Sequence, residues 1–229
     1  MENLLLKYMG QGLNKEAVKE AVGLRPVVTI SREFGCPSKL IAQMLTETIN
    51  HRIVEIHEKK WKFINKEVLE SAAVELQLNP SDVKYLLGLG EKGLLEDFLV
   101  SFSSNYVSNI KVKHTLRKVM NTIADAGHVI LVGRGSAAIL HHRPNSLHIR
   151  LMAPVEWRVH SVCEMRNINA DEARRLLENT DKKRAALFEL ILGHKMDPYI
   201  FDVAFNCSTL TRKEIVHSIT GLMEAREML

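Results

Sequence analysis

Three arginines of this sequence follow closely on short apolar runs, at positions where a buried strand would end. Arg32 comes directly after VVTIS, Arg134 lies in VGRGSAAIL, and Arg158 follows shortly after LHIRLMAP. A guanidinium presents a planar fork of donors that matches the oxygens of a phosphate group. The three arginines therefore indicate a site for a phosphorylated ligand. A structural arginine paired with a carboxylate is the alternative interpretation of Arg134.

The segment VVTISREFGCPSKLIAQML, residues 27–45, has the layout of a phosphate-binding loop. An apolar β-branched run leads into a turn at Gly35, and an amphipathic helical pattern follows. Such a loop holds a polyphosphate through backbone N–H groups, the helix dipole and one lysine. Lys39 supplies a cation at the helix start, but Pro37 has no N–H to donate. The strict GxxxxGK[ST] pattern is absent, so a simple strand-to-helix turn is the alternative.

A third feature is the basic segment DEARRLLENTDKKRAALFE, residues 171–189. Its leucines recur at helical spacing, which predicts an amphipathic helix. The charged side chains include Asp181 and the cations Arg174, Arg175, Lys182, Lys183 and Arg184. A solvated helix face is the usual explanation of such a run, and a helix that closes over an anionic site is the alternative.

The elements that must position these residues alternate between strand and helix. Strands are predicted at 27–31, 53–56, 128–132, 147–152 and 202–206, and helices at 39–49, 68–76, 107–126, 154–167, 170–191 and 212–228. Continuous apolar runs indicate strands buried on both faces, as in a parallel sheet. Alternation with helices indicates a three-layer α/β fold, in which ligands bind at the carboxyl ends of the strands.

The remaining segments complete one domain over residues 1–229. Residues 1–24 are predicted to form a helical extension, which could serve as a homodimer contact. Residues 57–115 contain no clear strand and are predicted to be a helical insertion, and 165–195 form a second cationic helical stretch. Both stretches could close over a site.

Composition excludes some classes of protein. The net charge of +4 and 6% aromatic residues give little support for a nucleic-acid binder. The three cysteines form no CxxC pair, so neither a zinc site nor a disulfide framework is predicted. No apolar stretch predicts a signal sequence or a membrane span, and the cytoplasm is the expected location.

In their order and spacing, these motifs resemble the cytidylate kinase-like family, a branch of the P-loop nucleoside monophosphate kinases. VTISREFGCPSKLIA stands where that branch typically reads ITISRxxGSGGREIA, and it keeps Ser31, Arg32 and Gly35. FINKEVLESAA, the GRG segment, the strand leading into AP.EWR and the last strand ending at Asn206 also match. The resemblance covers nearly everything from Val27 onward.

The resemblance implies a three-layer α/β/α P-loop NTPase-like fold with a five-stranded parallel sheet, an NMP-binding insertion at 57–115 and a mobile lid at 165–195. It implies transfer of the γ-phosphate of ATP, with Mg²⁺, to a nucleoside monophosphate, typically CMP or dCMP. The cofactor-binding residues would be Arg32, Gly35, Cys36, Ser38 and Lys39, with Ser38 on the metal. Arg134 and Asn65 would bind the acceptor, Lys39, Arg158 and Arg184 would act on the transferring group, and Asp181 would hold the lid arginines.

This sequence departs from the family pattern mainly in the loop. Ser38 stands at the lysine position and Lys39 at the metal-binding Ser/Thr position, while Cys36 and Pro37 replace serine and glycine. Asn65 replaces the aspartate of the insertion. Two hypotheses follow: a kinase with a displaced lysine, or a non-catalytic nucleotide- or phosphate-ligand-binding protein that has lost the ATP loop.

Overall fold

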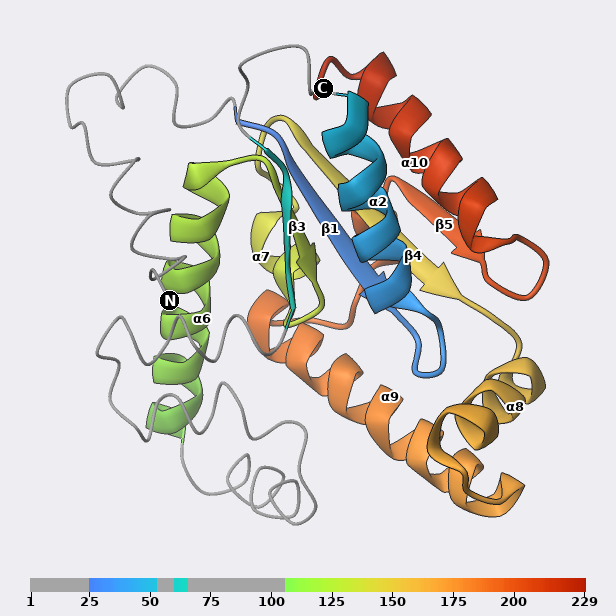
Figure 1. Cartoon of the computed structure of the whole chain (residues 1–229). Coiled ribbons are helices and arrows are strands. Elements are labelled where there is room, and N and C mark those ends of the chain that lie inside the picture. The colour runs from blue at the N-terminus through green and yellow to red at the C-terminus, as the bar shows by residue number, and fades with distance from the viewer. Residues whose placement is uncertain (1–24, 53–59, 66–105) are drawn as a thin grey trace, which may run out of the picture.

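Five parallel strands form the sheet, in the order β2-β3-β1-β4-β5 (Figure 1). The computed structural model of the chain describes residues 25–52, 60–65 and 106–229. The strands are β1 (Val27–Arg32), β2 (Lys62–Ile64), β3 (Val129–Val132), β4 (Ser146–Met152) and β5 (Val203–Asn206). The predicted parallel sheet is confirmed, and its central strand is the one that leads into the loop at Gly35.

The register of the sheet brings the three arginine-bearing strand ends to one edge. Val27 of β1 pairs with Val129 of β3 on one side and with Ser146 of β4 on the other. The pairing with β4 continues to Arg32, which lies beside Leu151. Because all the pairs are parallel, the loops that follow β1, β3 and β4 emerge together.

Helices cover both faces of the sheet (Figure 1). One layer consists of α2 (Ser38–Arg52) and α10 (Arg212–Ala225), and the other of α6 (Tyr106–Ala126), α7 (Ser136–Leu140) and α9 (Ala170–Leu192). Side chains alternate between these layers along β1: Val28 and Ile30 pack with α2 and α10, whereas Val27 packs with α6. Among the helices that the structure describes, none has the length and apolarity needed to cross a membrane.

Helix α8 (Val155–Arg166) connects β4 to α9 and forms a helical hairpin with α9. It ends at Asn167, which takes a left-handed conformation with φ 54°. Asn169 then caps α9 by accepting a hydrogen bond from the Glu172 N–H. This tight connection packs α8 against α9, so that Arg158 and Asp181 face each other.

The prediction that residues 57–115 contain no strand is wrong. The second strand occupies Lys62–Ile64, inside the stretch 57–115 where only helices and turns were expected. Its three residues are too few to show a clear apolar run, and only pairing with β3 makes them a strand. The predicted strand at 53–56, the predicted helix at 68–76 and the extension at 1–24 lie outside the described residues.

Candidate functional site

A cavity of about 270 Å³ lies at the carboxyl edge of the sheet, where the ends of β1, β3 and β4 meet α9. Its polar lining consists of Ser31, Arg32, Glu33, Arg134, Arg150, Asp181 and Arg184, and the remaining lining residues are Gly133, Gly135, Ala185, Leu187, Phe188, Met196 and Phe201. The cavity therefore joins a strongly cationic side to an apolar, partly aromatic side.

The arginines of the cavity crowd one another. Burial lowers the pKa of the Arg32 guanidinium, and the charges of Arg184 and Arg134 lower it further, while Asp181 partly opposes the shift. Burial likewise lowers the pKa of Arg184. Both shifts mean that the charged forms are disfavoured here. An anion in the cavity would relieve this cost.

The GRG segment brings Arg134 to the cavity through an unusual backbone. Gly133, Arg134 and Gly135 have φ values of 77°, 56° and 69°, all in the left-handed region. A Cβ atom at Gly133 would overlap the guanidinium of Arg32, so glycine is needed for Arg32 to lie against this loop. Arg134 itself adopts a conformation that costs about 1–2 kcal/mol for a non-glycine residue. Strain of this kind is typical of functional sites.

Arg150 and Glu33 are cavity residues that the sequence analysis missed. The Glu33 carboxylate lies 3.5 Å from Arg150 Nη2 and accepts the Ala153 N–H at 3.2 Å. The Arg150 guanidinium also contacts the Met196 sulfur at 3.4 Å and lies 5.5 Å from the centre of the Phe201 ring. A cation inside the otherwise apolar run LHIRLM was the available signal.

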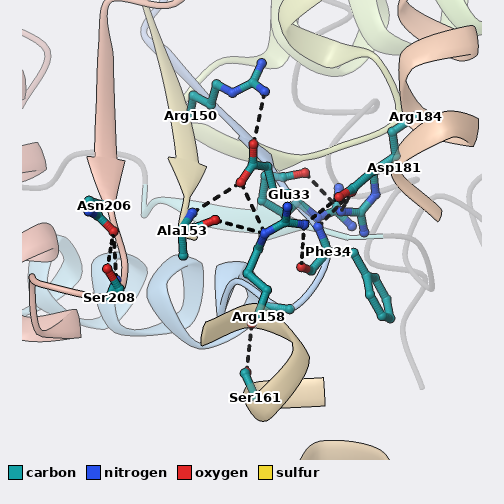
Figure 2. A network of polar contacts seen from close by, with 12 residues as sticks. Glu33, Phe34, Arg150, Ala153, Arg158, Ser161, Asp181, Arg184, Asn206 and Ser208 are labelled. Atoms are coloured by element: carbon teal, nitrogen blue, oxygen red, sulfur yellow. Dashed lines mark hydrogen bonds and ion pairs between the residues drawn. The ribbon is translucent and has the colours of Figure 1, made fainter. Parts of the chain in front are cut away.

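Arg158 lies beneath the loop between β1 and α2, and it does not line the cavity (Figure 2). It is buried, and its Nε donates to the Ala153 carbonyl at 2.9 Å. Its Nη1 donates to the Phe34 carbonyl at 3.3 Å and to Asp181 Oδ2 at 2.6 Å. Several of its donors are thus used within the protein, where they connect the loop, the end of β4 and α9.

Asp181 connects this network to the cavity. Its Oδ1 accepts the Phe34 N–H at 2.8 Å and lies 3.6 Å from Arg184 Nη1. Arg184 also donates to the Arg32 carbonyl at 2.9 Å, and its guanidinium lies 5.5 Å from the centre of the Phe34 ring. The structure therefore brings Asp181, Arg184 and Arg32 together at the cavity. Arg158 contacts the Oδ2 atom of the Asp181 carboxylate, and Arg184 lies near Oδ1 (Figure 2).

The loop between β1 and α2 directs several of its donors inward. The Cys36 N–H donates to the Glu33 carbonyl at 3.3 Å, and the Ser38 N–H donates to the Cys36 carbonyl at 2.9 Å. The Phe34 N–H is held by Asp181, and Pro37 has no N–H. A polyphosphate needs several such donors to point at it together. In this conformation the Phe34, Cys36 and Ser38 N–H groups are bonded within the protein and do not point together at the phosphates of ATP.

Gly35, Ser38 and Lys39, the other predicted cofactor-binding residues of the loop, do not line the cavity. Gly35, with φ 94°, packs so closely on the backbone of Arg158 that a Cβ there would meet the Arg158 carbonyl at 3.0 Å. Ser38 is buried, whereas Lys39 is exposed and is not a cavity residue. Over residues 25–52, 60–65 and 106–229, no group of three or more His, Cys, Asp or Glu side chains could hold a metal ion.

Asn65, the remaining predicted substrate residue, directly follows β2 at Ile64. It is half-buried and is not among the residues that line the cavity. Of the predicted site residues, the structure thus places Arg32, Arg134, Asp181 and Arg184 around one cavity. Asn65 does not line this cavity, and neither do the predicted loop residues Gly35, Cys36, Ser38 and Lys39, which lie at the start of α2.

Comparisons with known proteins agree with the fold. The model of the cytidylate kinase-like family matches residues 27–209. An uncharacterized protein from Eubacterium ventriosum ATCC 27560 superposes with a TM-score of 0.60 at 18% identity, covering 88% of this chain and 99% of that one. Shikimate kinase from Acinetobacter baumannii, in complex with shikimate, gives a TM-score of 0.49 at 11% identity, covering 91% and 98%. Among curated proteins, none matches this chain. The predicted three-layer α/β/α fold is confirmed.

Proposed function

The chain belongs to the cytidylate kinase-like family, and from this membership we propose that it is a phosphotransferase that binds a nucleoside monophosphate, with CMP or dCMP as the acceptor. The family generally uses ATP with Mg²⁺. Because three N–H groups of the loop between β1 and α2 are bonded within the protein, the proposal for the donor rests on the family and not on the loop.

One observation carries the proposal for the acceptor. Guanidinium groups from four separate parts of the fold converge on one cavity at the carboxyl edge of the sheet: Arg32, Arg134, Arg150 and Arg184. A monophosphate carries close to two negative charges at neutral pH, and it accepts forked hydrogen bonds from arginine. Such a group would lie best beside Arg32, Arg134 and Arg184, where burial first, and then the charges of Arg184 and Arg134, lower the pKa of Arg32.

The apolar side of the cavity suits the rest of a nucleotide. Leu187, Phe188 and Phe201 line it together with Arg150. A planar base can pack on aromatic side chains and can accept a hydrogen bond from a guanidinium. The cavity volume of about 270 Å³ is on the scale of a small ligand.

The residues of this chain would contribute positioning and charge to the reaction. Phosphoryl transfer needs in-line placement of the reacting groups and cations around the moving charge. Arg184 and Arg32 would hold the acceptor phosphate, and Asp181 would fix the direction of Arg184. Closure of α9 over the cavity would exclude water.

A second candidate function is binding without catalysis. The specific observation in its favour is that the Phe34, Cys36 and Ser38 N–H groups donate within the protein, which removes three donors that an ATP-binding loop would use. In this case the cavity would bind a nucleoside monophosphate as a signal or as cargo.

Calorimetric titration separates the two candidates. CMP, dCMP, UMP and AMP are titrated into wild type, Arg134→Ala and Lys39→Ala, with and without Mg²⁺-ATP, and turnover is followed in a coupled assay. Arg175→Ala is the matched control, because Arg175 is exposed on α9 away from the cavity. Binding of CMP that is lost in Arg134→Ala and kept in Arg175→Ala supports the cavity, and turnover supports the kinase. Binding without turnover supports the second candidate, and no nucleotide binding contradicts both.

A further inference from the structure

Glu33 and Arg150 form an ion pair at the cavity to which the proposed function gives no joint role (Figure 2). Arg150 lies on β4, beside Ser31 of β1, and Glu33 directly follows β1. Both side chains line the cavity, and both are partly exposed, Arg150 to 25% and Glu33 to 22%. A ligand in the cavity can therefore reach a carboxylate acceptor and a forked donor side by side.

The contacts of the Arg150 guanidinium are long or weak. Its Nη2 lies 3.5 Å from Glu33 Oε1, which is longer than a good charge-assisted hydrogen bond. Its Nη1 donates to the Met196 sulfur at 3.4 Å, and a thioether is a weak acceptor. Two adjacent acceptors on a ligand would be better partners, because a guanidinium donates two parallel hydrogen bonds to such a pair.

Glu33 is held from the side away from Arg150. Its Oε2 accepts the Ala153 N–H at 3.2 Å and lies 3.4 Å from Arg158 Nε. These contacts keep the carboxylate at the end of β4 even when the Arg150 guanidinium takes another partner, and its Oε1 faces Arg150. The pair thus presents one positioned acceptor next to two donors.

Aromatic rings lie beside this pair. The centre of the Phe201 ring is 5.5 Å from Arg150 Cζ, and the Phe188 ring lies 6.3 Å from the Phe201 ring, with an angle of 51° between their planes. Both rings belong to residues that line the cavity. A planar base that packs on them would bring its hydrogen-bonding edge next to Arg150.

We propose that Glu33 and Arg150 select cytosine over uracil in this cavity, an inference that rests on the proposed function. The edge of cytosine carries an amino donor at N4, followed by two acceptors, N3 and O2. Glu33 Oε1 accepts from the amino group, and the Arg150 fork donates to N3 and O2.

Uracil has the same size and shape but the wrong pattern. Its O4 oxygen would face the Glu33 carboxylate, and its N3–H would face the Arg150 guanidinium. Both contacts set like groups against each other and leave polar groups unpaired, which a site built for hydrogen bonding penalises strongly. The selection therefore follows from the hydrogen-bonding pattern of the base and not from its volume.

Calorimetric titration of CMP and UMP into the full chain tests this selection. The two nucleotides share sugar and phosphate, so the ratio of their Kd values reports the base alone. Wild type should bind CMP at least roughly tenfold more tightly than UMP. Glu33→Gln and Arg150→Met should each bring the ratio towards one, the first also by strengthening UMP, because the glutamine amide can donate to O4. Arg175→Met, at an exposed arginine of α9, is the control and should keep the wild-type ratio.

A change of charge near the phosphate alters the affinity for both nucleotides alike and cancels in the ratio. Equal binding of CMP and UMP to wild type, still lost in Arg134→Ala, would overturn this inference and leave the proposed function standing. A ratio that stays at the wild-type value in both Glu33→Gln and Arg150→Met would also overturn it. No binding of either nucleotide would overturn the proposed function as well. The wild-type comparison decides even if a variant fails to fold.

Discussion

Replacing Arg158 by methionine tests whether a buried guanidinium holds the loop to the sheet edge and to α9. The Arg158 side chain is 7% exposed, and its partners Glu33 and Asp181 are 22% and 28% exposed. Methionine keeps much of the apolar stem and removes hydrogen bonds to the Ala153 and Phe34 carbonyls and to Asp181. The change therefore leaves the Asp181 carboxylate without its closest cation.

Removing one partner of a buried ion pair costs about 3–5 kcal/mol. Because water reaches both carboxylates, we take the lower limit, a loss of about 3 kcal/mol in the free energy of unfolding. For a chain of this length each kcal/mol shifts the midpoint of thermal unfolding by about 2–4 °C, so Arg158→Met should lower it by roughly 6–12 °C.

Scanning calorimetry and urea unfolding measure this effect, and Arg174→Met is the matched control. Arg174 also joins α9 to α8, through two hydrogen bonds of 3.0 and 2.9 Å to Glu156, but that pair is exposed. Exposed pairs contribute little, so the control should unfold close to wild type. Arg158 does not hold the loop in this way if Arg158→Met unfolds within about a degree of wild type, or if both variants lose the same free energy of unfolding.

Two further predictions concern the cavity and the pH dependence of stability. Gly133→Ala should displace the Arg32 guanidinium and weaken CMP binding by roughly tenfold or more. Gly193→Ala is the control and should not weaken binding, because Gly193 has a similar φ of 85° and nothing within 4 Å of an added Cβ. Equal CMP affinities of the two variants, measured by calorimetry, would argue against the Arg32 contact. Burial lowers the pKa of His148, so the unfolded chain binds more protons there below about pH 6.5, and the free energy of unfolding should fall as the pH drops from 6.5 towards 5. Urea titrations should show a flatter fall for His148→Gln and an unchanged fall for the exposed control His51→Gln; an unchanged slope in His148→Gln would contradict this assignment.

Local sequence patterns were sufficient for four of the five strands, β1, β3, β4 and β5, and for part of the cavity. The apolar run at 27–31 predicts a buried strand, and the glycines around Arg134 predict a left-handed backbone. Both properties depend mainly on the types of the residues themselves. Arg32 and Arg134 could therefore be placed at strand ends. The parallel register then brings those ends together without further information.

The roles of Arg150 and Arg158 could not be predicted in this way. Arg150 points into the cavity because β4 lies between β1 and β5 in one particular register, with Arg150 beside Ser31 and Ala204. Arg158 is buried because α8 passes beneath the loop and places it against Asp181, 23 positions later in the sequence. Both outcomes depend on how distant segments pack, which the spacing of residues along the chain does not encode.

A crystal structure of the protein with bound CMP would show directly whether the arginine-lined cavity holds the nucleotide. We predict that the phosphate lies within hydrogen-bond distance of Arg32, Arg134 and Arg184, and that the base lies on the side of Phe188 and Phe201. A nucleotide bound instead at the loop between β1 and α2, with that cavity empty, would contradict it.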